Sequence, residues 1–231
     1  MDFDLILDTF GKLIGGAGMT LQLIIPALAI GIVLAMVLAL MRMSGDGVLS
    51  RLSRAYVFVF RGTPLLVQIF LIYFGAGQFF KFWQWLGVWD WPLREAVPMA
   101  VIAFAMNTAA YTSEIIRGGL QAVPFGQIEA ARACGMSRSL VFRRITVPIA
   151  IRQALPAYGN EVILMVKASS LASIITIMEI TGIAKQINSQ TFAPFEVFTA
   201  AGILYLAINF VVAQTVRVVE WRLTPHLRRR S

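Results

Sequence analysis

Four uncharged apolar runs in this chain are long enough, or nearly long enough, to cross a lipid bilayer. They lie at residues 18–41, 62–80, 96–113 and 197–216, in a sequence that is 58% hydrophobic. About 20 residues of helix span the roughly 30 Å of hydrocarbon in a bilayer. Because backbone groups in hydrocarbon must be hydrogen-bonded within the protein, single runs of this length can cross only as helices. The sequence therefore predicts an all-α integral membrane protein.

A fifth apolar segment, residues 157–183, is interrupted by the charged residues Glu161, Lys167 and Glu179. Charges are rare inside spans because inserting one costs about 3 kcal/mol. Counting this segment, we predict a single transmembrane domain over residues 1–231 with five spans and with the two termini on opposite sides. The approximate bounds of the spans are 18–41, 62–80, 96–116, 157–183 and 197–219.

The basic residues are distributed unequally between the two predicted sides of the membrane. With the N-terminus outside, fifteen arginines lie inside: Arg42, Arg51, Arg54, Arg61, Arg117, Arg132, Arg138, Arg143, Arg144, Arg152, Arg217, Arg222, Arg228, Arg229 and Arg230. Only Lys12, Lys81, Arg94 and Lys185 lie outside. Basic loops stay in the cytoplasm, so we predict an outer N-terminus and a cytoplasmic C-terminus. This pattern explains the net charge of +8 without nucleic acid as a partner.

The predicted cytoplasmic loop, about residues 120–156, carries a spaced motif. It reads Glu-Ala-Ala at 129–131, three residues, Gly135, nine residues, Ile145, one residue, Val147 and Pro148. We expect a short helix at 127–133, because alanine favours helices, and a left-handed residue at Gly135 that ends it. Ser137 is placed to cap a second helix at 140–145, and Pro148 and Pro156 are expected to close the segment.

This motif resembles the EAA loop of bacterial ABC-importer permeases, written E-A-A-x3-G-x9-I-x-L-P, with Val147 in place of leucine. In that family the loop forms the coupling helix that docks on an ATPase. The resemblance assigns ATPase coupling to the matching positions, which are Glu129, Ala130, Ala131, Gly135, Ile145 and Pro148. The alternative is a plain basic loop that only folds back on the bilayer.

Three further segments resemble permeases for polar amino acids. Residues 61–68 match R-G-T-P-x-x-x-Q, residues 111–119 match Y-x-x-E-x-x-R-G-G, and residues 167–171 match K-x-[ST]-S-L. Together with the loop, these matches cover most of residues 18–220. Residues 160–165 look most like the M-type permease subunits for histidine and other basic amino acids, and for opines such as octopine and nopaline.

The resemblance implies a type I ABC-importer permease fold in the bacterial inner membrane, with a periplasmic N-terminus. It implies a second, related permease in a heterodimer, two copies of an ABC ATPase and a periplasmic substrate-binding protein. ATP and Mg would be bound by the ATPase, since this chain has no G-x-x-x-x-G-K-[ST] loop. The chain itself would hold no cofactor and would be a transporter subunit rather than an enzyme.

The charged and hydroxylic residues of the fourth predicted span suggest a translocation pathway. Glu161 and Lys167 are six residues apart and do not share a helix face. We expect Ser169 and Ser170 to lie near the substrate and Glu161 to attract a cationic group such as a guanidinium. Alternatively, Glu161 reaches the inner interface and Lys167 bonds to carbonyls of a neighbouring helix.

Other polar residues at span depth are Gln68 and Asn107. Both are pathway candidates, although hydrogen bonding between helices is the more common use of such side chains. Glu114 and Arg117 are three residues apart and can share one helix face. A local ion pair between them is favoured over a contact with substrate.

Other functions fit the sequence less well. One cysteine and one histidine exclude a Cys/His metal cluster, and the spans contain no set of groups that would serve a membrane enzyme. An ion-driven transporter usually has repeated halves, which five spans do not provide. The remaining alternatives are an importer of the same type for glutamine or glutamate, and a non-transporting membrane scaffold with an EAA-like loop.

Overall fold

The computed structural model describes residues 3–45, 47–87 and 93–223, and these contain helices and no strands. The predicted all-α class is confirmed for this part of the chain. The elements are α1 (Phe3–Met43), α2 (Val48–Gly62), α3 (Leu65–Gln78), α4 (Phe80–Trp85), α5 (Ala96–Gln121), α6 (Phe125–Ala133), α7 (Arg138–Val141), the π-helical turn η2 (Phe142–Thr146), α8 (Val147–Ala168), the 3₁₀ segment η3 (Ser169–Ile175), α9 (Ile180–Thr191) and α10 (Pro194–Leu223).

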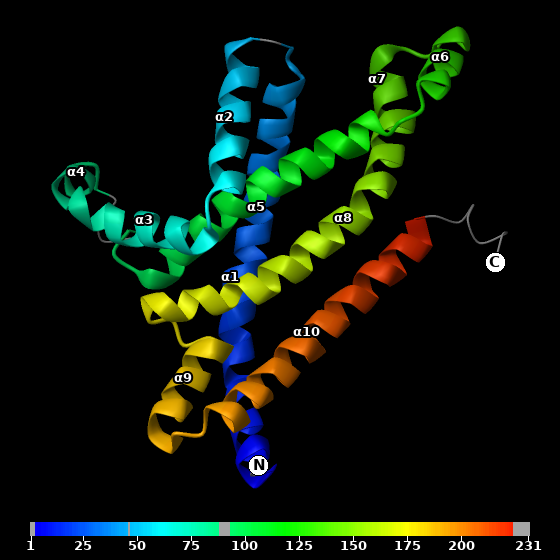
Figure 1. The fold of residues 1–231 in the computed structure, drawn as a ribbon. Helices are drawn as coiled ribbons and strands as arrows, with labels where there is room; N and C mark the ends of the chain where they lie inside the picture. Colours follow the sequence, from blue (N-terminus) through cyan, green and yellow to red (C-terminus); the bar gives the residue numbers. More distant parts are fainter. Residues whose placement is uncertain (1–2, 46, 88–92, 224–231) are drawn as a thin grey trace.

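Helix α5 lies at the centre of the fold, packed between α1 and α8 (Figure 1). Its buried face is built mainly from small side chains, including Ala100, Ala103 and Ala109, which are fully buried. Small residues let two backbones approach closely, which strengthens packing where no hydrophobic effect operates between helices. At Gly31 of α1 the approach is so close that a Cβ atom would overlap the methyl group of Thr108.

The chain returns along α8 and then along α10, which packs on α8 and on α1 (Figure 1). A second core lies between the first part of α1, α9 and α10, around Leu13, Ile180 and Val197. Helices α6 and α7 lie at the end of the molecule that is farthest from the N-terminus (Figure 1).

Three helices, α1, α5 and α10, are long and apolar enough to cross a membrane by themselves. Two bent helix pairs reach the same standard when each pair is taken as one span, which gives up to five spans. The helices extend beyond the predicted spans, since α1 has 41 residues and α5 continues to Gln121.

The segment predicted as a second span at 62–80 consists mainly of α3, a helix of 14 residues, with a sharp bend at its start. Helices α2 and α3 meet at 106°, because Pro64 disfavours helical geometry at Thr63, which is extended. Gln68 stabilises the bend, since its amide nitrogen donates to the Phe60 carbonyl at 2.8 Å and to Thr63 Oγ1 at 2.8 Å. Asn107 of α5 donates to Gln68 Oε1 at 2.8 Å.

The predicted fourth span at 157–183 is also broken. Helix α8 begins ten residues earlier, at Val147, and ends at Ala168, where η3 takes over. Thr176 then adopts a left-handed conformation with a φ of 66°, which a β-branched residue rarely does. The helix axis turns by 51° between η3 and α9. The single apolar run of the sequence therefore forms two helical segments with different directions.

Gly119 and Gly118 give a matched test of the contact between α5 and α8. A Cβ atom at Gly119 would lie 2.7 Å from the Ala150 carbonyl oxygen, whereas nothing lies within 4 Å of the same position at Gly118. We expect Gly119→Ala to destabilise the protein by about 1–3 kcal/mol through overpacking. Gly118→Ala should raise stability by up to about 1 kcal/mol through helix propensity. Thermal unfolding in detergent measures both, and equal melting temperatures for the two variants would contradict the close packing.

Candidate functional site

The loop between α5 and α8 forms the helix, turn and second helix that the sequence predicts. Helix α6 covers Phe125–Ala133, and Gly135 has a φ of +81°. The Gly135 amide donates to the Arg132 carbonyl at 2.9 Å and the Met136 amide to the Ala131 carbonyl at 3.1 Å. These two bonds make a Schellman motif, which needs a left-handed residue at this position. The prediction for Gly135 is confirmed.

The motif residues of α6 differ in exposure. Glu129 and Ala130 are exposed, whereas Ala131 is buried, with 6% of its surface accessible. Helix α6 contacts α7 and η2, and it presents Phe125 with 76% of its surface exposed. Ala131 therefore packs inside the loop, while Glu129 and Ala130 are free for contact with another molecule.

The second part of the motif lies in a continuous helical segment. Ser137 caps α7, because its Oγ accepts a hydrogen bond from the Leu140 amide at 3.4 Å. The prediction that Pro148 and Pro156 close the segment is wrong, because both lie within α8. The chain passes through η2, which contains Ile145, directly into α8, and Pro148 lies in the first turn of α8. The helix continues through this point, since the Val147 amide donates to the Phe142 carbonyl five residues back, and Pro148 follows directly where π geometry changes to α geometry.

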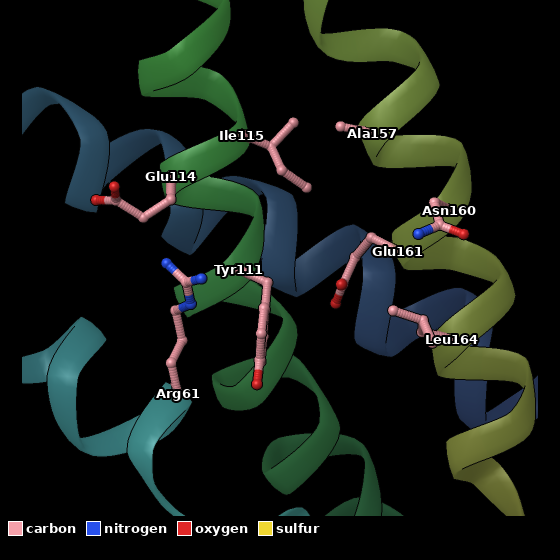
Figure 2. A pocket seen from close by; sticks show the side chains of 8 residues that line it. All are labelled: Arg61, Tyr111, Glu114, Ile115, Ala157, Asn160, Glu161 and Leu164. Carbon is pink, nitrogen blue, oxygen red and sulfur yellow. The ribbon is translucent and has the colours of Figure 1, made fainter.

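A pocket of about 330 Å³ opens between α2, α5 and α8 (Figure 2). The side chains that line it are Arg61, Tyr111, Glu114, Ile115, Ala157, Asn160, Glu161 and Leu164. The guanidinium carbon of Arg61 lies 5.2 Å from the centre of the Tyr111 ring, within the range of a cation–π contact. The pocket thus combines one guanidinium, two carboxylates and an amide with apolar walls.

Glu161 lies in the wall of this pocket. It is 6% exposed, and its Oε1 accepts a hydrogen bond from Thr108 Oγ1 of α5 at 2.8 Å. Lys167 is exposed at the last turn of α8, and no ion pair joins it to Glu161 in the described part of the chain. Glu161 points into the protein and no described carbonyl accepts from Lys167, so the alternative with an interfacial Glu161 does not fit this structure. The attraction of Glu161 for a cationic group stays a prediction.

Ser169 and Ser170 begin η3, where α8 ends. Ser169 is fully buried and donates to the Val166 carbonyl at 2.8 Å, and Ser170 donates to the Lys167 carbonyl at 2.7 Å. Hydroxyls that bond to preceding carbonyls often accompany helix distortion. Neither serine lines the pocket that contains Glu161, so a contact with substrate remains a prediction.

Gln68 and Asn107, the other two pathway candidates, are joined by hydrogen bonds at the bend between α2 and α3. Both are largely buried, at 5% and 7% exposure. They make the interhelical bonds that the sequence favoured, and they do not line the pocket around Glu161.

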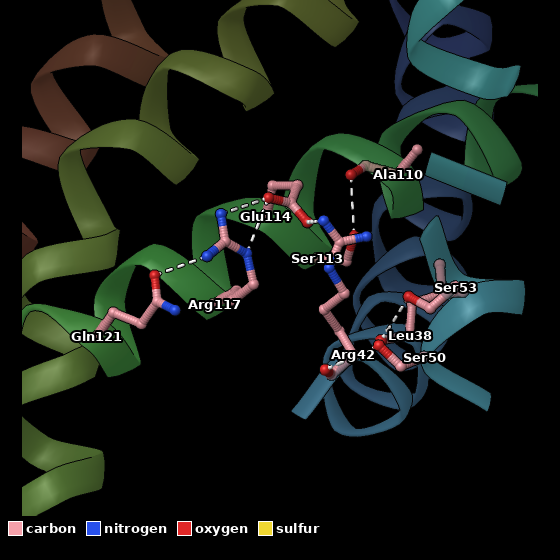
Figure 3. A network of polar contacts seen from close by, with 9 residues as sticks. All are labelled: Leu38, Arg42, Ser50, Ser53, Ala110, Ser113, Glu114, Arg117 and Gln121. Carbon is pink, nitrogen blue, oxygen red and sulfur yellow. Dashed lines mark hydrogen bonds and ion pairs between the residues drawn. The ribbon is translucent and has the colours of Figure 1, made fainter. Parts of the chain in front are cut away.

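The predicted ion pair between Glu114 and Arg117 is present (Figure 3). Arg117 donates from Nε at 2.9 Å and from Nη2 at 2.6 Å to the same carboxylate oxygen, Oε2. Arg42 of α1 approaches the other oxygen at 3.9 Å. Glu114 also lines the pocket, so one carboxylate joins the pocket to a group of arginines at the ends of α1 and α5.

In the sequence, Glu179 stands out only as a charge within an apolar segment, and no role was assigned to it. Glu179 is fully buried and caps α9, since its Oε1 accepts from the Gly182 amide at 2.9 Å. Its Oε2 accepts from the Tyr205 hydroxyl of α10 at 2.6 Å. The available signal was a charged residue inside an apolar segment, followed three residues later by glycine, which is typical of a helix start.

We compared the chain with known protein families and with known proteins. Residues 19–225 match the model of the family "Binding-protein-dependent transport system inner membrane component". The nopaline transport system permease protein NocM of Agrobacterium fabrum is 56% identical over 230 residues, which cover 100% of this chain and 95% of that protein. The octopine permease OccM of Rhizobium meliloti is 54% identical, covering 99% and 94%. The Escherichia coli histidine/lysine/arginine/ornithine permease HisM is 39% identical, covering 96% and 93%.

Solved structures of ABC transporters have the same fold as this chain. A structure described as "Crystal structure of an amino acid ABC transporter with histidines" superposes with a TM-score of 0.82 at 36% identity, over 96% of this chain and 99% of that one. The MetNI methionine ABC transporter in an inward-facing form shares the fold, with a TM-score of 0.70 at 18% identity over 92% and 96%. The chain therefore belongs to the family of binding-protein-dependent transport system inner membrane components and has the fold of ABC-importer permeases.

Proposed function

We propose that this chain is the permease subunit of an ATP-driven, binding-protein-dependent importer for opines or basic amino acids. The family supports the transport role, and the named relatives are permeases for nopaline, octopine and basic amino acids. Two of these relatives share more than half of their residues with the chain along its whole length.

The observation that carries the substrate class is the buried carboxylate of Glu161. It faces a pocket whose wall also contains Arg61 and Asn160 (Figure 2), and Thr108 is its one hydrogen-bond donor within the described part of the chain. A carboxylate in an apolar setting favours a cationic partner. An arginine-derived opine carries a guanidinium together with carboxylates, so Glu161 and Arg61 offer a charge of the right sign to each part.

The chain is proposed to cross the bacterial inner membrane five times, with a periplasmic N-terminus and a cytoplasmic C-terminus. The position of α6 and α7 at the end opposite the N-terminus supports this orientation (Figure 1). The basic residues Arg132, Arg138, Arg143 and Arg144 lie at that same end, as the positive-inside rule requires. Arg228, Arg229 and Arg230, which contributed to the sequence argument, lie outside the described residues.

The complete importer is proposed to contain a second, related permease as a heterodimer partner, two ABC ATPase subunits and a periplasmic binding protein. ATP and Mg would be bound by the ATPase, and the chain would hold no cofactor of its own. The exposed surface of α6 supports docking to the ATPase, because Phe125, Glu129 and Ala130 are accessible. Closure of the ATPase on ATP would move α6 and open the pathway outward, and hydrolysis would reset it inward.

Glu129 and Gln127 provide a matched test of coupling, because both are exposed on α6. A hydrogen bond to a charged group contributes about 1.5–3 kcal/mol. We therefore expect Glu129→Ala to lower substrate-driven ATP hydrolysis by about tenfold or more. Gln127→Ala should change it less than about twofold. ATP hydrolysis by the purified complex in proteoliposomes measures the effect, and equal losses in both variants would refute a specific role for Glu129.

Glu161→Gln tests the substrate class, because it removes the charge and keeps the size of the side chain. We expect uptake of cationic ligands to fall about tenfold, since a charge-assisted hydrogen bond is roughly twice as strong as a neutral one. Glu95→Gln is the control, because Glu95 is exposed and outside the pocket. Radiolabelled uptake into proteoliposomes is the measurement. Unchanged uptake and selectivity in Glu161→Gln would show that Glu161 does not meet the substrate.

A further inference from the structure

A second, smaller pocket lies between the C-terminal ends of α1 and α5. Its volume is about 240 Å³, and it is lined by Arg42, Met43, Arg117, Leu120 and Gln121. Figure 3 shows that Arg42 of α1 and Arg117 of α5 converge on Glu114 from opposite sides. The pocket is separate from the one that contains Glu161, although Glu114 connects the two.

The two arginines of this pocket differ in their partners. Arg117 makes two short bonds to Glu114 and donates from Nη1 to Gln121 Oε1 at 2.6 Å. Among the described residues, the only polar partner of the Arg42 side chain is Glu114, whose Oε1 lies 3.9 Å from Arg42 Nη2. The Arg42 side chain is nevertheless mostly buried, with 27% of its surface exposed. A partly buried guanidinium with unused donors favours an anion with several acceptor oxygens.

The electrostatic balance at this pocket is positive. Two guanidinium groups face one carboxylate, that of Glu114. The carbonyl groups that would repel an anion at the end of α1 are partly occupied by hydroxyl donors. Ser44 Oγ donates to the Met41 carbonyl at 2.7 Å, and Ser50 Oγ donates weakly to the Arg42 carbonyl at 3.4 Å. The helix end therefore opposes an anion less than an uncapped one would.

An apolar stripe leads along α1 to the pocket. Met36, Leu40 and Met43 follow one another at helical spacing and are 47%, 66% and 54% exposed. Residues four and three apart lie on one face of a helix. The stripe ends at the arginines, at the C-terminal end of α1, a helix apolar enough to cross a membrane. Anionic lipid phosphates attract basic residues that lie next to a span on its cytoplasmic side. An apolar strip that ends in a basic pocket fits a molecule with both an acyl chain and a phosphate.

We propose that this pocket binds the phosphate of an anionic phospholipid, with Arg42 and Arg117 as its ligands and the acyl chain along Met36, Leu40 and Met43. Free phosphate offers the same oxygens but has nothing to place on the stripe. The inference requires that the chain crosses a membrane and does not depend on which solute is carried. Its readout is lipid binding, so its failure can be distinguished from failure of the transport proposal.

The test measures binding of a fluorescent short-chain phosphatidylglycerol to the delipidated, purified complex in a neutral detergent. We expect Arg42→Gln to weaken binding at least fivefold and Arg42→Lys to retain part of it, because lysine keeps the charge but loses the planar fork. The control is Arg51→Gln, which removes an exposed arginine outside the pocket. It should leave the affinity within twofold of the unmodified complex.

Two competitors identify the source of the phosphate. Short-chain phosphatidylglycerol without a dye should displace the probe at concentrations at least tenfold below those of inorganic phosphate. Equal potency of inorganic phosphate would overturn the assignment to a lipid. If Arg42→Gln and Arg51→Gln weaken binding of the probe equally, the binding reflects general attraction between charges, and the proposed site is wrong. No weakening by Arg42→Gln, with the complex intact, would also overturn it, and an acidic residue of a partner subunit would then be the better occupant.

Discussion

Two contacts of Thr108 on α5 connect α1 and α8, two helices that pack against α5. Its methyl group fills the space left by Gly31 on α1, and its hydroxyl donates to Glu161 on α8 at 2.8 Å. A single side chain of α5 therefore links the close packing against α1 to the position of a buried carboxylate on α8. A larger residue at Gly31 would separate α1 from α5, and the loss of the hydroxyl would leave Glu161 without its one described donor, which is costly inside a protein.

The breaks in the helices place polar groups within apolar segments that are long enough to cross a membrane. Irregular backbone is tolerated there only where other protein groups satisfy it, and both bends meet that condition. Gln68 donates hydrogen bonds to groups at the bend near Thr63, and Asn107 donates to Gln68. Glu179 caps the helix that follows the second bend. The pocket around Glu161 lies between helices positioned by these bends, so the same residues that interrupt the apolar pattern also shape the candidate pathway.

The sequence predicted the features that depend on local chemistry. Alanine content and Gly135 predicted α6 and its end, the spacing of Glu114 and Arg117 predicted their ion pair, and the spaced motif predicted the family. Pro64 was a visible signal for the bend between α2 and α3. The sequence did not predict the bend within residues 157–183, because an apolar run is equally compatible with a straight helix and with two short ones. It also left the orientation of Glu161 open between two alternatives, since only the packing of α8 against α5 brings Thr108 within reach. Proline at 148 was misread as an end, although the helix continues through it after a π-helical turn.

The most direct test of the central claim is ATP hydrolysis by the complex that copurifies with this chain, reconstituted in proteoliposomes. The cognate binding protein would be loaded in turn with arginine, lysine, histidine, ornithine, octopine, nopaline, glutamine and glutamate. The account predicts stimulation by the cationic amino acids or the opines and none by glutamine or glutamate. Stimulation by glutamine or glutamate alone would contradict the substrate class. No stimulation by any ligand, with the ATPase bound and active, would contradict the importer itself and favour a scaffold.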